Sequence, residues 1–276
     1  MTISKQVERL IAEKGYLQFT DYHKIPGGLK KLDFTINTLV SHQRKIFNSD
    51  GNTDFKILEV GCGNGNLSIP LGSLGFEVLG VDVDSDSIDY ATRINTLGNV
   101  RFQLVGEQGF DFDEKFDVII CSEVLEHLAE PSRLIKPMIS VLKDNGILII
   151  TIPNGYGPRE VLGRLEKYLR RNLKLGRYVD LVRKLMGMIP KEKKHHIHSS
   201  NPNQEHVQKF TRSSIERLML ENGLKVSEKR NSFLLFSVFG RYSGSGSILD
   251  HLDCKLADYL PSAIVSGWYL ICKKIL

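Results

Sequence analysis

Two short stretches of this sequence concentrate residue types that do chemistry, and the first begins at an acid. Glu59, Gly61, Gly63 and Gly65 alternate with other residues directly after a short apolar run. Glycines in such a turn let the backbone adopt positive φ and approach a ligand closely. A dinucleotide fingerprint needs the spacing G-x-G-x-x-G, and Asn66 stands where its third glycine would be. The spacing therefore predicts a ligand other than a dinucleotide.

The second stretch holds two carboxylates and an imidazole within five residues. If the segment turns helically, Glu123, Glu126 and His127 fall at i, i+3 and i+4 and project from one face. Such a set can hold a divalent ion such as Mg²⁺, and His206, which can fold back over the site, is the candidate fourth ligand. Alternatively, His127 is a general base, since its ordinary pKa of about 6.5 suits that role. His127 and His206 are thus the candidate catalytic residues.

The glycine stretch resembles the first motif of the class I S-adenosylmethionine-dependent methyltransferases. The motifs at the ends of the next apolar runs agree, and so does the turn Leu-Lys-Asp-Asn-Gly at 142–146. The resemblance implies that S-adenosylmethionine is bound by Glu59, Gly61, Cys62, Gly63, Gly65, Asp82, Val83, Glu107 and Ser122. In these roles Glu59 faces the amino end of the methionine moiety, Asp82 the two ribose hydroxyls and Ser122 the methionine part. Glu107 stands where family members often have an Asp that contacts the adenine amino group.

The segment from Glu123 to His127 is similar to segments in two methyltransferase families. One comprises the O-methyltransferases of ubiquinone biosynthesis, and the other the small-RNA 3′-end 2′-O-methyltransferases, which bind Mg²⁺ beside two ribose hydroxyls. A metal held by adjacent hydroxyls lowers the pKa of the attacking oxygen. Metal-free relatives carry the same Glu-His-Leu, where it is structural or lines the pocket, so the metal remains an open alternative.

The elements that must position these residues follow from periodicity. Short apolar runs alternate with helical stretches, which predicts an α/β fold with a parallel sheet covered on both faces. Strands are expected at 56–60, 76–81, 100–105, 116–121, 146–152, 224–237 and 267–273, and helices at 66–74, 85–95, 132–142 and 213–222. The resemblance implies a Rossmann-like sheet of seven strands with only the last antiparallel. We expect a helical cap at 1–54, a methyltransferase domain at 55–276 and a basic helical lid inserted at 154–205.

Composition places the chain among ordinary globular proteins. Its 276 residues are 41% apolar, and the four cysteines have no paired spacing, which argues against a disulfide framework and a cysteine zinc site. We see no secretory signal and no run long enough to span a bilayer, so we expect a cytoplasmic protein. The net charge of +5 is uneven. Residues 159–194 hold twelve Lys or Arg and four Asp or Glu, a net +8, which leaves −3 elsewhere.

This basic insert is the expected acceptor platform, and three interpretations of it remain open. It is a lid with its apolar face on the core, a peripheral membrane contact through 159–194, or a stripe that follows a phosphate backbone. Nucleic acid is the less favoured partner, because the insert has no recognised RNA-binding motif. We expect methyl transfer to a hydroxyl of a small or lipid-linked molecule, such as a quinone precursor or a glycan-related compound. RNA 2′-O-methylation and cofactor binding without turnover are the alternatives, and the oligomeric state is open.

Overall fold

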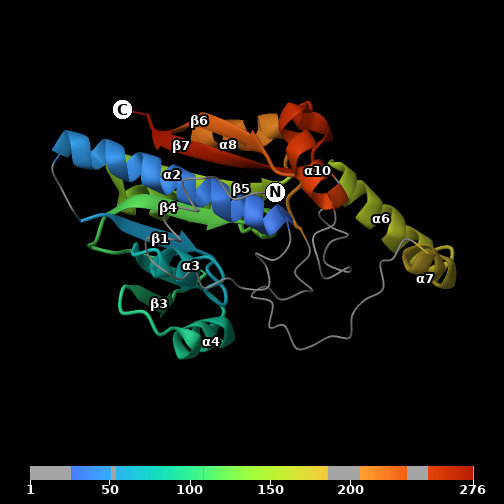
Figure 1. The fold of residues 1–276 in the computed structure, drawn as a ribbon, viewed down its shortest axis with the longest axis horizontal. Coiled ribbons are helices and arrows are strands. Elements are labelled where there is room, and N and C mark those ends of the chain that lie inside the picture. The colour runs from blue at the N-terminus through green and yellow to red at the C-terminus, as the bar shows by residue number, and fades with distance from the viewer. Residues whose placement is uncertain (1–25, 51–53, 108, 186–205, 235–247, 276) are drawn as a thin grey trace.

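The computed structural model describes residues 26–50, 54–107, 109–185, 206–234 and 248–275 (Figure 1). Its strands are β1 Lys56–Val60, β2 Glu77–Asp82, β3 Val100–Leu104, β4 Phe116–Ser122, β5 Leu142–Pro153, β6 Leu224–Asn231 and β7 Gly267–Lys274. Its helices are α2 Pro26–Asp50, α3 Ser68–Ser73, α4 Ser85–Ile94, α5 Ser132–Val141, α6 Pro158–Arg171, α7 Gly176–Leu185, α8 Arg212–Glu221 and α10 Ile248–Leu256. The predicted cap residues 1–25 and insert residues 186–205 lie outside the described residues.

The seven strands form one sheet in the order β3-β2-β1-β4-β5-β7-β6. Strands β1 to β5 pair in parallel with one another, and β7 pairs antiparallel with both β5 and β6. Only β7 therefore runs against the other six, which confirms the predicted α/β class and its single reversed strand. Because the carboxyl ends of six strands share one edge, the residues that follow them are brought together there.

Helices cover both faces of the sheet, as the apolar strands require (Figure 1). On one face, α2 and α3 pack with residues such as Ile57, Val118 and Ile149 in one buried cluster. On the other, α5 and α8 pack with the alternate residues, among them Leu58 and Ile150. Alternate residues of one strand thus point into two cores, which anchors the strand ends that carry the site.

Helix α2 belongs to this packed body through the first of these clusters. It begins at Pro26, so the Pro-Gly-Gly sequence starts the helix, and a proline is favoured in a first turn, where its missing N–H costs nothing. Its Lys30 is 1% exposed and donates to the Cys254 carbonyl and to Asp258 beside α10. Of its apolar side chains, Ile36 is buried and Phe47 is exposed.

Helices α6 and α7 differ from the others because they project from the body (Figure 1). None of the α6 side chains is buried. The interpretation of the insert as a lid whose apolar face packs on the core therefore does not describe α6. No helix among the described residues combines the length and the apolar character that crossing a membrane requires.

Candidate active site

The glycine-rich turn leaves β1 at the carboxyl edge of the sheet. Gly61, Gly63 and Gly65 have φ of 76°, 49° and 74°, a region that residues with a Cβ rarely adopt. The amides of Gly61 and Cys62 both donate to the Val81 carbonyl, at 2.8 and 3.0 Å. The turn is thereby tied to β2, and the alternating glycines predicted from the sequence are required by its backbone.

Asp82 at the end of β2 holds the same turn by its side chain. One carboxylate oxygen accepts from the Gly63 amide at 2.7 Å, and the other accepts from the Asp84 amide at 3.0 Å. An ionised carboxylate offers about four lone-pair positions, so each oxygen can accept one more hydrogen bond. Asp82 is therefore placed to position the turn and to receive two hydroxyl donors together.

Glu59 lies beneath the turn and is only 4% exposed. The Ser68 hydroxyl at the start of α3 donates to its carboxylate. Burial raises the pKa of Glu59 to about 7, although the hydrogen bonds from Ser68 act in the opposite direction. A carboxyl group in this state is placed to accept from a cationic amino group of a ligand, which would favour its ionised form.

A polar network joins α2 to the ends of β4 and β5. The Lys31 ammonium donates to the Ser122 hydroxyl at 3.1 Å and to the Glu123 carboxylate at 3.4 Å. The Thr151 hydroxyl lies 2.8 Å from that of Ser122 and donates to Glu123 at 3.1 Å. Burial alone would raise the pKa of Glu123, but the positive charges of Lys31 and Arg159 and the hydrogen bonds hold it below its usual value.

The backbone of Glu123 takes a turn that the sequence analysis did not foresee. Its φ is +57°, and a short 3-10 helix begins only at Leu125, so the expected helical face from Glu123 to His127 is wrong. The Glu123 side chain instead joins the network with Lys31. A left-handed residue directly after a strand breaks the regular helical spacing, so Glu123 does not share one helical face with Glu126 and His127, although its charge still acts on Glu126.

Glu126, His127 and His206 form the second group of the site. One ligand atom from each lies within 4.8 Å of the others, and the two imidazole rings are 5.1 Å apart at their centroids. Glu126 is 1% exposed; one of its carboxyl oxygens lies 3.9 Å from the His127 Nε2, and neither oxygen has a hydrogen-bond partner among the described residues. Burial raises the pKa of Glu126 well above its usual value, and the negative charge of Glu123 adds to that shift.

Backbone hydrogen bonds bring His206 to this group from a distant part of the chain. The amides of Val207 and Gln208 both donate to the Glu126 carbonyl at 2.9 Å. The His206 Nδ1 lies 3.5 Å from the Glu160 carboxylate on α6, and this contact lowers the pKa of Glu160. The structure thus brings together three of the four predicted metal ligands and adds Glu160 at the rim.

The remaining predicted cofactor residues lie along the same edge. Val83 follows Asp82 and is 53% exposed, and Glu107 is exposed in the turn after β3. The Val105 amide donates to the Asp82 carbonyl at 2.9 Å, which holds the end of β3 beside that of β2. Cys62 is buried, and burial raises the pKa of its thiol, so it serves the turn as a small apolar residue. All four cysteines are free, as their spacing predicted.

Sequence reasoning missed Lys31 and Glu160 as parts of the site. Lys31 stands 92 residues before its partner Glu123, in a helix whose pattern indicated only packing. Glu160 was counted with the insert charges. It lies in the first turn of α6, and only the contact with the distant His206 brings it to the site, so the local sequence carried no signal for it.

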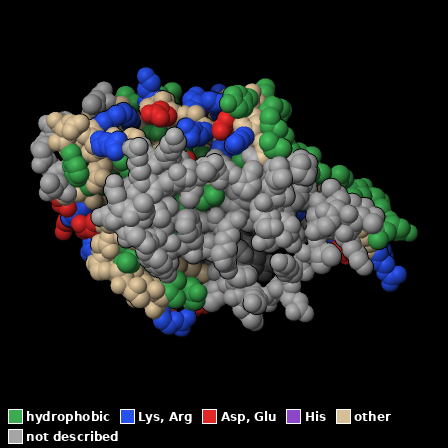
Figure 2. Space-filling view, viewed as in Figure 1, with side chains coloured by type: hydrophobic (Ala, Val, Ile, Leu, Met, Phe, Trp, Pro, Cys, Tyr) green, Lys and Arg blue, Asp and Glu red, His purple; other side chains and the backbone are tan. Residues whose placement is uncertain are grey.

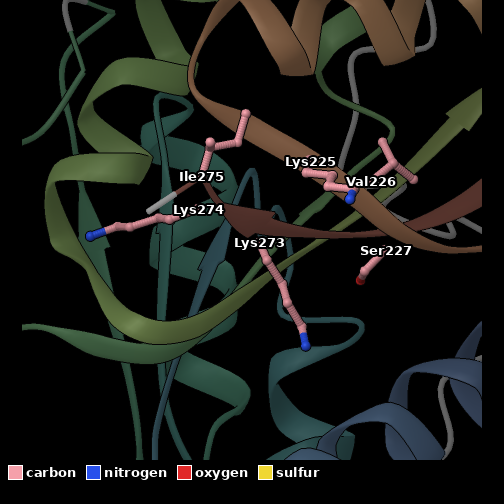
Figure 3. A pocket seen from close by; sticks show the side chains of 6 residues that line it. All are labelled: Lys225, Val226, Ser227, Lys273, Lys274 and Ile275. Carbon is pink, nitrogen blue, oxygen red and sulfur yellow. The ribbon is translucent and has the colours of Figure 1, made fainter.

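A cavity of about 520 Å³ lies elsewhere, at the far edge of the sheet (Figure 3). It is lined by Lys225, Val226, Ser227, Lys273, Lys274 and Ile275 from β6 and the end of β7. Lys225 and Lys273 are opposite each other in the strand pairing. This basic cavity contains none of the predicted site residues.

The fold and this edge of the sheet have the features of the class I methyltransferases that use S-adenosylmethionine. They comprise a seven-stranded sheet with one reversed strand, a glycine turn with a buried acid, and an acid ending β2. The model of a methyltransferase domain family matches residues 35–229, and the chain belongs to this family. The protein is therefore a methyltransferase, with S-adenosylmethionine as its methyl donor.

Individual relatives agree with this assignment. The chain is 25% identical over 201 residues to a ubiquinone biosynthesis O-methyltransferase of Rickettsia canadensis, with 72% of each chain covered. For the protein of that name from Rickettsia felis, identity is 30% over 135 residues, which spans 48% of this chain and about half (53%) of the relative. The crystal structure of magnesium protoporphyrin IX methyltransferase from Synechocystis is similar in fold, with a TM-score of 0.51 and 18% identity over 99% of this chain and 95% of that one.

Proposed function

We propose that the protein methylates a hydroxyl oxygen of a small or lipid-linked acceptor, such as a quinone precursor or a glycan-related molecule. The observation that carries the proposal is the buried Glu126 carboxyl, which lies beside two imidazoles and has no hydrogen-bond partner in the part of the chain that the structure describes. A buried polar group without a hydrogen bond is energetically costly, and a bound ligand that supplies the missing hydrogen bond would account for it. The O-methyltransferase names of the curated relatives support an oxygen acceptor.

S-adenosylmethionine supplies a methyl group on a sulfonium, so the residues of this chain have to align the reactants and accept a proton. In this proposal Asp82 accepts from the ribose hydroxyls and Glu59 from the methionine amino group. An oxygen lone pair of the acceptor forms the new C–O bond while the S–C bond breaks, and its electron pair stays on sulfur. The hydroxyl proton passes to the imidazole of His127 or His206. Alignment of this kind contributes about 7–11 kcal/mol to catalysis.

A divalent ion is the alternative to this imidazole base, because an imidazole whose free nitrogen binds a metal cannot accept the hydroxyl proton, which would then pass to solvent. Glu126, His127 and His206 would hold it, and it would lower the pKa of an acceptor hydroxyl bound beside them. With Glu123 paired to Lys31, the donor set is one carboxylate and two imidazoles. That set suits Mn²⁺ or Zn²⁺ better than Mg²⁺, which prefers oxygen ligands. Glu123 is therefore not available as a ligand in this arrangement, so the predicted Mg²⁺ site with two glutamates is reduced to one glutamate.

An assay with a labelled methyl group tests the acceptor class. The protein is incubated with methyl-labelled S-adenosylmethionine and cell extract, and the label is followed into lipid, water-soluble, RNA and protein fractions. We expect the label in the lipid or small-molecule fraction and S-adenosylhomocysteine release in step with it. Label in RNA would instead support 2′-O-methylation, and S-adenosylhomocysteine binding without release would leave a cofactor-binding protein; either result overturns the proposal.

Two treatments separate the catalytic groups from the metal. His127→Gln is expected to abolish methyl transfer while S-adenosylhomocysteine binding is retained, because the imidazole is not among the groups placed for the cofactor. EDTA followed by Mg²⁺, Mn²⁺ or Zn²⁺ should remove and restore turnover if an ion is used. If EDTA leaves turnover unchanged, the metal proposal is refuted, and the imidazole remains the proposed proton acceptor.

If the acceptor is lipid-linked, the protein has to reach it from a peripheral position at a membrane surface. The basic segment 159–194 is the part of the chain that we propose for such a contact. Its described helices, α6 and α7, leave the body next to the candidate active site.

A further inference from the structure

Helices α6 and α7 and the segment between them carry a set of exposed apolar side chains, called here the α6–α7 ridge. Its members are each between 43% and 67% exposed, and they are Val161, Leu162, Leu165, Tyr168, Leu173, Tyr178 and Leu181. Figure 2 shows hydrophobic side chains gathered along this projecting arm. Monomeric soluble proteins rarely expose apolar side chains in such sets, and where they do, the set is usually an interaction site.

Positive charge accompanies the ridge. Residues 158–185 contain nine Lys or Arg and three Asp or Glu. Two of these acids, Glu166 and Asp180, both accept from Arg170, and the third, Glu160, faces His206. Each acid has a cationic or imidazole neighbour within the protein, and the surface of the arm exposes the basic side chains Lys167, Arg171, Lys174 and Arg177.

The two helices are held as one unit and are rooted in the candidate active site. The Arg170 guanidinium bonds Glu166 in its own helix at 2.8 Å and Asp180 in α7 at 2.5 Å. At the root, Arg164 donates to the Gly155 carbonyl at 2.8 Å. The contact of Glu160 with His206, at 3.5 Å, places the first turn of α6 beside the imidazole cluster.

We propose that the α6–α7 ridge docks on an anionic membrane surface and that the acceptor is therefore an amphiphile. Its apolar tail stays in the bilayer while its hydroxyl-bearing head reaches Glu126, His127 and His206. Basic helices with exposed Leu and Tyr bind such interfaces through apolar burial combined with attraction to anionic headgroups. A phosphate backbone would meet the charges but would leave the Leu and Tyr side chains in water. This inference rests on the proposed function for the identity of the reacting group.

Vesicle co-sedimentation of the full-length chain tests the docking. Vesicles of phosphatidylcholine alone are compared with vesicles that also contain phosphatidylglycerol, at low and high salt. Binding to the anionic vesicles that weakens with salt is expected, with little binding to the neutral ones. Equal binding to both compositions, or binding to RNA without binding to anionic vesicles, would overturn the inference.

Matched variants assign the binding to the ridge. The triple variant Leu162→Ser, Leu165→Ser and Tyr168→Ser should lose about tenfold or more in vesicle affinity. The control replaces Leu104, Leu220 and Leu256 by Ser; these leucines are 50–61% exposed elsewhere on the body, and their loss should leave binding unchanged. Thermal unfolding of both triple variants shows whether they fold. An equal loss of binding in two folded variants would contradict the assignment to the ridge.

Charge is tested in the same way. Lys174→Gln with Arg177→Gln should weaken binding about tenfold or more, since each basic residue near an anionic surface contributes several-fold. Lys225→Gln with Lys273→Gln removes the same charge from the cavity of Figure 3 and should have little effect. An equal effect of the two pairs would mean that net charge alone attracts the protein, which overturns the inference.

The docking of the ridge on membranes and the proposed hydroxyl methylation can be refuted independently of each other. Vesicle binding is measured without methyl donor or acceptor, so it does not depend on the reaction. If ridge variants stop binding vesicles but still methylate a water-soluble, short-tailed analogue of the acceptor, the ridge and the reaction are both supported. If the protein binds vesicles but methylates no hydroxyl in any fraction, the proposed function fails while the docking surface stands.

Discussion

Replacing Glu59 by Gln should change how the stability of the protein depends on pH. Glu59 is 4% exposed and accepts a hydrogen bond from Ser68, and burial raises its pKa from 4.5 to about 7. Below pH 4.5 the carboxyl is protonated in both the folded and the unfolded chain. Between pH 4.5 and 7 the unfolded chain loses this proton while the folded protein keeps it, so the free energy of unfolding falls as the pH rises.

The size of the effect follows from that difference in pKa. One pKa unit corresponds to 1.36 kcal/mol, so the ionisation of Glu59 lowers the free energy of unfolding by about 3 kcal/mol across this pH range. Gln has nearly the same shape, can accept from Ser68 and does not ionise. The Glu59→Gln variant should therefore gain about 3 kcal/mol relative to the wild type between pH 4.5 and 7.5.

Urea unfolding at several pH values, without cofactor, measures this difference. The fluorescence of Trp268, the only tryptophan of the chain and 2% exposed in β7, reports the transition. Taking the difference between wild type and variant removes the titration of the other groups. Glu107→Gln, at an exposed acid on the same edge, is the control and should show no such trend. If the difference for Glu59 varies by less than about 1 kcal/mol over this range, our account of its buried carboxyl is refuted.

Two further substitutions test the geometry of the site. Lys31→Met removes the cation that binds Glu123; because that carboxylate is 37% exposed, we expect a loss of only about 1–2 kcal/mol in urea unfolding, most of it retained by Lys31→Arg. Lys31→Met with unchanged stability would mean that solvent already satisfies Glu123. Gly61→Ala should cost about 2–4 kcal/mol in the same assay, because its φ is +76° and a Cβ would overlap the side chain of Val124. Gly98→Ala, where a Cβ meets open space, is its control and should stay within about 0.5 kcal/mol; equal effects would contradict the role of the turn.

Most of the fold could be predicted from local sequence. The apolar runs that predict buried strands correspond to all seven strands of the sheet, and the glycine turn falls where the sequence places it. The errors lie at the ends of elements. Strand β5 begins at Leu142, four residues before the expected start, because Leu142 pairs with Phe116 across an irregular register. Such pairing depends on a neighbouring strand and leaves no periodic signal in the strand itself.

The glycine turn and the acids Glu59 and Asp82 were accessible to sequence reasoning because they lie in and directly after β1 and β2. The acceptor half was only partly accessible. His206 was correctly brought to Glu126 and His127, whereas Glu123 was assigned to the same face on the assumption of a regular helix. A single left-handed residue, with φ of +57°, redirects its side chain toward Lys31. Helical periodicity cannot show a reversal of this kind, since it assumes uniform backbone angles.

By itself, the sequence determined the α/β sheet, the glycine turn with Glu59 and Asp82, and the concentration of positive charge in 159–194. These properties are local, since each follows from neighbouring residues whose types restrict the backbone or share one helical face. Only the tertiary structure decided which distant groups meet, namely Lys31 with Glu123 and Glu160 with His206. It also decided that the apolar side of α6 is exposed, because burial depends on what packs against a helix.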